Sequence, residues 1–202
     1  MNQTIAQQPL RAYTLNEIRY YLRVMPCAAC GKGPWAIDSS SPPDPASRLV
    51  TVRARCHACG DTLEQTFCCE LDLPAEGAES EVINPTDSPS RLIDLGGWLS
   101  LFYLLIESAA ADPVVLSIRR QGYQATLCLA EALKFYGEDE LPGEGAFFSA
   151  ASAQAFRDHP EKFARQKLRD ILSRLPALPL MARRISADER KQRPRWWRFW
   201  MR

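Results

Sequence analysis

The spacing of hydrophobic positions changes about halfway along the chain. Residues 49–55 alternate, with Val50, Val52 and Ala54 on one side and polar side chains on the other, which predicts a strand with one exposed face. Residues 61–69 are the expected antiparallel partner, with Leu63, Thr66 or Phe67 turned inward. From residue 90 to residue 110, apolar side chains occupy every face of a helical pattern. That pattern predicts the central helix of a bundle.

Local signals place the remaining elements. Thr14 and Glu17 have the spacing of a capping box, which predicts a helix over 15–24 that ends before Pro26. The segment 39–45 (SSSPPDP) predicts a loop. Asp112 followed by proline predicts the start of one or two helices that end near Gly137. Two shorter helices are expected near 150–157 and from Pro160 to Leu175.

These elements together predict an α+β fold, in which a small N-terminal antiparallel β unit precedes a mostly α-helical domain. We expect a leading helix and β unit over 1–72, an acidic linker with prolines over 73–89, and the helical domain over 90–180. A basic, aromatic tail over 181–202 completes the chain.

Composition agrees with a folded protein, because 46% of the 202 residues are hydrophobic and 24% are charged. The net charge of +1 gives no support to a protein that coats nucleic acid with its whole surface. It conceals an uneven distribution: residues 68–145 carry four basic and fourteen acidic side chains, whereas residues 146–202 carry fourteen basic and five acidic ones. Such blocks indicate intramolecular docking, an anionic partner or simply solvated faces.

Four of the seven cysteines form two copies of one motif. Cys27 and Cys30 stand in CAACG, and Cys56 and Cys59 stand in CHACG. Two intervening residues let both thiolates face one ion, and the following glycine lets the backbone tighten around the sulfur atoms. Over about residues 25–70 the chain resembles the zinc ribbon superfamily. The resemblance implies a zinc ion and a small antiparallel sheet, and it specifies no function.

The four cysteines predict one structural zinc ion per chain, because a site filled by four thiolates leaves no position for a reacting water. Redox-active or buried cysteines and an iron–sulfur cluster are the alternatives. The three remaining cysteines, Cys68, Cys69 and Cys128, are interpreted as buried hydrophobic side chains. The odd number of cysteines and the lack of a secretory signal predict a reducing, cytoplasmic compartment.

No catalytic motif accompanies the cysteines. The chain has two histidines: His57 lies inside the second motif, and His159, just before Pro160, is interpreted as a helix cap. Neither a phosphate-binding loop nor a nucleophile elbow is present. We therefore expect a protein that is not an enzyme and has no evident small-molecule substrate.

The C-terminal tail supplies the candidate partner-binding residues. Its aromatic rings need a surface to pack on, because a segment this short cannot bury them alone. Arginine beside tryptophan is typical of binding hot spots. The favoured partner is another protein or a second copy of the chain, with a membrane surface or a nucleic acid as alternatives. The candidate residues are Arg195, Trp196, Trp197, Arg198, Phe199 and Trp200.

Together these features predict a zinc-stabilised, non-catalytic interaction or adaptor protein. The alternative is a nucleic-acid-binding accessory protein that uses the tail and the ribbon. In that alternative Arg53 and Arg55 share one face of a strand and Trp35 is a stacking partner. Two arginines and one tryptophan form a weak footprint for nucleic acid.

Overall fold

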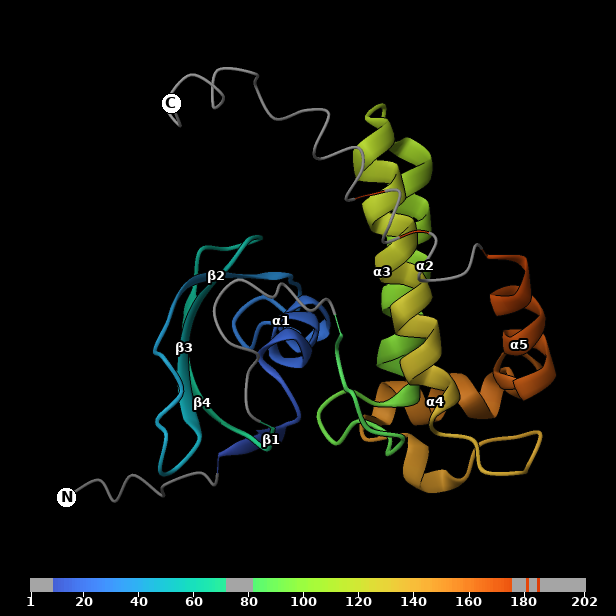
Figure 1. The fold of residues 1–202 in the computed structure, drawn as a ribbon, viewed down its shortest axis with the longest axis horizontal. Helices are drawn as coiled ribbons and strands as arrows, with labels where there is room; N and C mark the ends of the chain where they lie inside the picture. Colours follow the sequence, from blue (N-terminus) through green and yellow to red (C-terminus); the bar gives the residue numbers. More distant parts are fainter. Residues whose placement is uncertain (1–8, 72–81, 176–180, 182–184, 186–202) are drawn as a thin grey trace, which may run out of the picture.

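The computed structural model describes residues 9–71, 82–175, 181 and 185 and has an α+β fold. A sheet and a short helix form the N-terminal part, and a long helical hairpin with shorter helices forms the C-terminal part (Figure 1). The sheet contains β1 (Leu10–Ala12), β2 (Trp35–Ser40), β3 (Leu49–Cys56) and β4 (Thr62–Cys69) in the order β1-β4-β3-β2.

The alternation predicted for residues 49–55 is present in β3. Val50, Val52 and Ala54 are buried, and β3 pairs with β4 so that Val50 lies opposite Phe67. Phe67 is fully buried, whereas Leu63 and Thr66 are only partly buried. β2 and β4 both run antiparallel to β3. The short β1, which the sequence pattern did not predict, runs parallel to the end of β4.

Helix α1 (Leu15–Val24) lies between the sheet and the helical part (Figure 1). Its N-terminus carries the predicted cap, because Thr14 Oγ1 accepts a hydrogen bond from the Glu17 N–H at 3.2 Å. The Glu17 carboxylate accepts from the Tyr13 N–H at 2.5 Å, one residue earlier than a standard capping box would place the donor. Helix α1 contacts β1 and β2 of the sheet and helix α2 of the hairpin. Its residues Ile18, Tyr20 and Leu22 are therefore buried.

The helical part is built on the hairpin of α2 (Leu95–Ala111) and α3 (Val115–Leu133), which extends beyond the rest of the molecule (Figure 1). Helix α4 (Ala150–Asp158) and helix α5 (Arg165–Arg174) pack near its base. Two short 3-10 helices, η1 (Glu144–Ala146) and η2 (Pro160–Phe163), connect these elements. The sheet, α1 and the helices share one continuous hydrophobic core, which contains Trp35, Ile18 and Trp98.

Three local predictions differ from the structure. The helix expected from residue 90 begins at Leu95, because the Asp94 carboxylate caps it by accepting from the Gly97 N–H. Part of the predicted 39–45 loop belongs to β2, which ends at Ser40. The helix expected from Pro160 is divided into η2 and α5 by Ala164, whose extended backbone interrupts it. The division of the chain into four segments stays a prediction.

Candidate metal centre

Two similar turns hold the four predicted cysteines. In the first turn the Gly31 N–H donates to the Cys27 carbonyl at 2.8 Å, and in the second the Gly60 N–H donates to the Cys56 carbonyl at 2.9 Å. Both glycines have positive φ, +69° and +78°, a conformation that favours glycine over any residue with a Cβ. The repeated CxxCG motif therefore produces two matching backbone turns.

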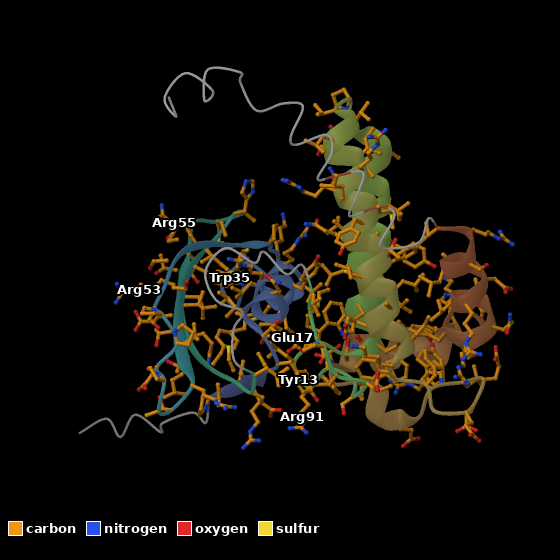
Figure 2. All side chains as sticks on the ribbon, viewed as in Figure 1. Tyr13, Glu17, Trp35, Arg53, Arg55 and Arg91 are labelled. Carbon is orange, nitrogen blue, oxygen red and sulfur yellow. The ribbon has the colours of Figure 1, made fainter. Side chains whose placement is uncertain are left out.

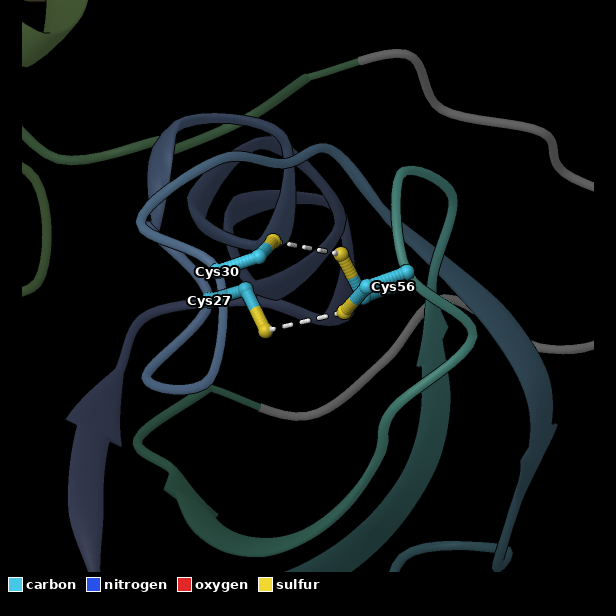
Figure 3. Close-up of side chains that lie close together, drawn as sticks. Cys27, Cys30 and Cys56 are labelled. Atoms are coloured by element: carbon cyan, nitrogen blue, oxygen red, sulfur yellow. Dashed lines mark hydrogen bonds between the residues drawn. The ribbon is translucent and has the colours of Figure 1, made fainter.

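The two turns bring all four sulfur atoms together. Each sulfur of Cys27, Cys30, Cys56 and Cys59 lies within 4.8 Å of the others. Cys27 Sγ is 3.7 Å from Cys59 Sγ, and Cys30 Sγ is 3.8 Å from Cys56 Sγ (Figure 3). These separations are far longer than a disulfide bond of about 2.05 Å. They leave room for an ion at the centre, so the predicted group of four is confirmed as a cluster at metal-binding distance.

The electrostatics of the cluster require a cation when the thiols ionise. Burial opposes ionisation of Cys56, but the N–H groups of Cys59 and Ala58 and the neighbouring thiols outweigh it and lower the pKa of Cys56 to about 7. The Asp61 N–H lowers the pKa of Cys59, yet the adjacent Cys30 thiol, desolvation and the other sulfurs raise it to about 12. Four negative sulfurs this close repel one another unless a positive ion lies between them.

The site has no histidine ligand. His57 lies between two of the cysteines in sequence and is exposed. His159 is the C-terminal cap of α4, and its imidazole Nδ1 lies 3.5 Å from a Glu161 carboxylate oxygen at the surface. In the part of the chain described, the group at metal-binding distance consists of these four cysteines and includes no histidine.

The other three cysteines lie apart from the cluster. Cys69 and Cys128 are buried, and burial raises the pKa of both thiols, that of Cys69 to about 11. Cys68 is half-buried, with its sulfur 3.9 Å from the Ser47 carbonyl oxygen. Thiols held in the protonated form are poor nucleophiles and poor ligands.

The arginines considered for nucleic acid binding lie on the outer face of the sheet (Figure 2). Arg53 pairs with Glu64 at 2.6 Å, and Arg55 pairs with Asp38 at 3.2 Å. Trp35 is 6% exposed and lies in the core, so the expectation that it stacks on a base is wrong. The alternation of β2 does not reveal this burial, because its other residues are all exposed. The tail residues 195–200 lie outside the described residues.

A groove that the sequence did not predict lies between the end of α1, with Met25 and Pro26 after it, and helix α2. It encloses about 720 Å³. One wall comes from the end of α1 and the residues that lead to Cys27, and the other comes from α2 and the segment before α4. Leu104 and Phe148 are 50% and 51% exposed on the second wall. Its apolar lining includes Tyr21, Val24, Met25, Pro26, Leu104 and Phe148.

Sequence patterns could not have found this groove, because one wall comes from residues 21–26 and the other from residues 92–104 and 148–152. The exposed position of Leu104 was hidden because apolar side chains occupy every face of the helical pattern over residues 95–106. The one sequence feature that points to this groove is Met25-Pro26, an apolar pair that directly precedes Cys27.

Comparison with family models, with curated proteins and with solved structures finds no match. Among the described helices, none has both the length and the apolar character needed to cross a membrane.

Proposed function

We propose that this chain is a non-catalytic interaction protein, in which a structural zinc ion stabilises a small β unit and the groove between the end of α1 and helix α2 binds a partner protein. The observation that carries the proposal is the groove beside a metal site made of four thiolates. A closed site of this kind stabilises structure and supplies no reactive water, whereas an apolar groove supplies binding energy.

The sulfur geometry favours zinc as the ion. A tetrahedral zinc ion with Zn–S bonds of about 2.3 Å places its ligands about 3.8 Å apart. Two of the six separations, 3.7 and 3.8 Å, agree with that value, and all six are within 4.8 Å. An iron–sulfur cluster needs a larger cage, because inorganic sulfide and more than one iron lie between the thiolates. We therefore assign one structural zinc ion to Cys27, Cys30, Cys56 and Cys59.

Zinc acts here by holding the groove in shape. Met25 and Pro26 line the groove and directly precede the ligand Cys27. The Cys27 N–H donates to the Lys32 carbonyl, so the first turn is also fixed by its own backbone. Binding of the ion therefore orders one wall of the groove, and loss of the ion releases it.

A segment rich in aromatic side chains is the kind of partner that this groove fits. Leu104 and Phe148 expose large apolar surfaces beside small residues such as Gly97, Ser100 and Ala151. Small residues leave space for an inserted ring, and exposed apolar surface is the main source of binding energy. The aromatic tail, with Trp196, Trp197, Phe199 and Trp200, provides a second contact with the same or another partner.

Paired surface mutations test the groove. Leu104→Arg places a charge on the groove wall, whereas Val115→Arg makes the same type of change on α3, outside the residues that line the groove, where Val115 is 60% exposed. Tagged wild-type protein and both variants are cross-linked in a cell extract, and the cross-linked peptides are identified by mass spectrometry. We expect partner cross-links to residues 92–104 and 148–152 that disappear in Leu104→Arg and persist in Val115→Arg.

Further measurements distinguish a protein partner from a second copy of the chain and from nucleic acid. A version that ends at residue 185 reports the contribution of the tail, and light scattering reports a second copy as the partner. Equal cross-linking by both arginine variants would contradict the groove as the binding site. Salt-dependent binding to arbitrary DNA or RNA, abolished when Arg53 and Arg55 are replaced by glutamine, would support nucleic acid binding instead.

A further inference from the structure

A group of buried polar side chains, here called the polar seam, joins α1 to the helical part. Glu17 comes from α1, Asn84 and Ser90 from the segment before α2, and Glu131 and Lys134 from the end of α3. Glu17 is 0% exposed and Glu131 is 5% exposed. Figure 2 shows Glu17 between the sheet side and the helices. Burying a charged carboxylate costs free energy, whereas burying a neutral carboxyl group costs less. The stability of this contact therefore depends on whether Glu17 and Glu131 are protonated.

Glu17 uses only one of its carboxyl oxygens for hydrogen bonding. The Tyr13 N–H donates to Oε2 at 2.5 Å, and the Ser90 hydroxyl is a further donor to the carboxylate. Oε1 has no hydrogen-bond partner in the structure. The Ser90 oxygen also accepts from the N–H groups of Leu92 and Ile93. Glu17 is thereby connected to the chain that leads into α2.

The Glu131 carboxyl group likewise has a hydrogen-bond partner at only one of its two oxygens. Lys134 Nζ lies 2.8 Å from Glu131 Oε1 and also donates to the Asn84 carbonyl at 2.8 Å. Oε2 of Glu131 is buried and has no hydrogen-bond partner in the structure. The seam therefore contains two buried carboxyl groups, one ammonium group and two buried oxygens without donors.

The charges around the seam do not balance when both carboxyl groups ionise. Lys134 is attracted to both, but Glu17 and Glu131 repel each other. Glu70 also lies near Glu17 and adds to the repulsion, although its own carboxylate is paired with Arg91 at 3.0 Å and Arg11 at 3.5 Å. Cys69 from the end of β4 faces Glu17 as a buried neutral thiol. Burial raises the pKa of Glu17 and raises that of Glu131 to about 7. One ammonium group cannot neutralise two carboxylates in this environment.

We propose that the Glu17–Glu131 pair holds a proton in slightly acidic solution, and that release of this proton loosens the contact between α1 and the helices. The groove lies between the same two parts, at the other end of α1, so the seam regulates its width. This second consequence rests on the proposed function of the groove, whereas the proton-controlled contact does not.

The direction of the effect follows from the two pKa values. In the opened state the carboxyl groups are hydrated and return to their ordinary pKa of 4.5, whereas in the closed state that of Glu131 is about 7. Between these values the closed state binds more protons than the opened state. Raising the pH through this window therefore favours opening, and the effect is complete above the higher value.

Hydrogen exchange of the full-length, zinc-loaded protein measures the opening directly. Amide protection of residues 15–24 is followed from pH 5.5 to pH 7.5, corrected for intrinsic exchange, with zinc content measured at each pH. One released proton changes the opening equilibrium by up to about tenfold per pH unit. We expect protection of α1 to fall by more than threefold over this range, whereas protection of β3 stays constant.

Three variants decide the assignment. Glu131→Gln and Glu17→Gln keep the shape of the side chain but replace the ionisable carboxyl group with an amide that does not titrate. Each variant is therefore expected to reduce the pH dependence of α1 protection. Glu107→Gln on the exposed side of α2 is the matched control and is expected to behave as the wild type. Constant protection of α1 in the wild type, or an unchanged slope in both seam variants, would overturn the proposal. No partner takes part in this readout, so its failure leaves the proposed groove function separately testable.

Discussion

The ring of Tyr20 on α1 lies 5.9 Å from the indole of Trp98 on α2, with the two planes inclined at 49°. Trp98 is fully buried and Tyr20 is 8% exposed. This contact joins the part of the chain that contains the cysteine cluster to the helical hairpin. Tilted aromatic pairs at this distance contribute about 0.5–1.5 kcal/mol beyond the burial of their area.

Replacement of Trp98 by alanine is expected to lower the free energy of unfolding by about 3–5 kcal/mol, because it removes a large buried side chain and leaves a cavity. Urea denaturation followed by circular dichroism measures the change. Because the core is continuous, the sheet and the helices should lose stability together. Tyr103→Ala on the same helix, 45% exposed, is the control and should change stability by less than about 1 kcal/mol. A loss confined to the helical signal would contradict the shared core.

A second close contact depends on the absence of a side chain. A Cβ on Gly96 would lie 2.4 Å from Ser152 Oγ and 2.8 Å from Ser152 Cβ, so α2 and α4 could not keep their separation. We expect Gly96→Ala to destabilise the protein by about 1–3 kcal/mol. Removing the hydroxyl in the double variant Gly96→Ala, Ser152→Ala should recover part of this loss.

Gly122 on α3 is the matched control for this prediction. A Cβ there would meet no atom within 4 Å, and alanine favours a helix over glycine by about 0.5–1 kcal/mol. Gly122→Ala should therefore stabilise the protein slightly, and thermal melting of the Gly96 and Gly122 variants measures both changes. Equal destabilisation by both alanine variants would show that helix packing at Gly96 is not the cause.

The cysteines divide into ligands and packing residues, and metal analysis separates them. Cys56→Ser should lose most of the bound zinc, because three thiolates bind the ion less tightly than four. Cys128→Ser should keep one zinc ion per chain and lose about 1–2 kcal/mol of stability, since the side chain is buried. Full zinc content in Cys56→Ser, or its loss in Cys128→Ser, would show that the ligands are assigned wrongly.

The sequence predicted the elements whose signals are local. Alternation in β3, the Thr14 cap of α1 and the paired cysteine motifs each depend on residues a few positions apart, and all three are present. The short β1 and the burial of Trp35 were missed, because both depend on distant partners: β1 pairs with residues 67–69, and Trp35 lies opposite Cys56 in the sheet. The spacing of hydrophobic residues along the sequence does not show which distant segments pair in the sheet.

In the candidate site, too, the features that depend on neighbouring residues were predicted and those that depend on distant contacts were not. Four ligands could be named from spacing, because each CxxCG turn is built by its own backbone. The groove and the polar seam could not be named, since they form only when α1 packs against the hairpin. Glu17 was recognised as a capping residue, but its contact with Ser90, more than 70 positions along the chain, gives it the second role.

X-ray absorption at the zinc edge of the purified full-length protein measures which atoms surround the ion at the four cysteines. A closed structural site predicts one zinc ion per chain with four sulfur neighbours at about 2.3 Å and no nitrogen or oxygen neighbour. An ion with three or fewer sulfur neighbours and a water oxygen at about 2.0–2.2 Å would contradict the account, because such an open position is what a catalytic zinc requires.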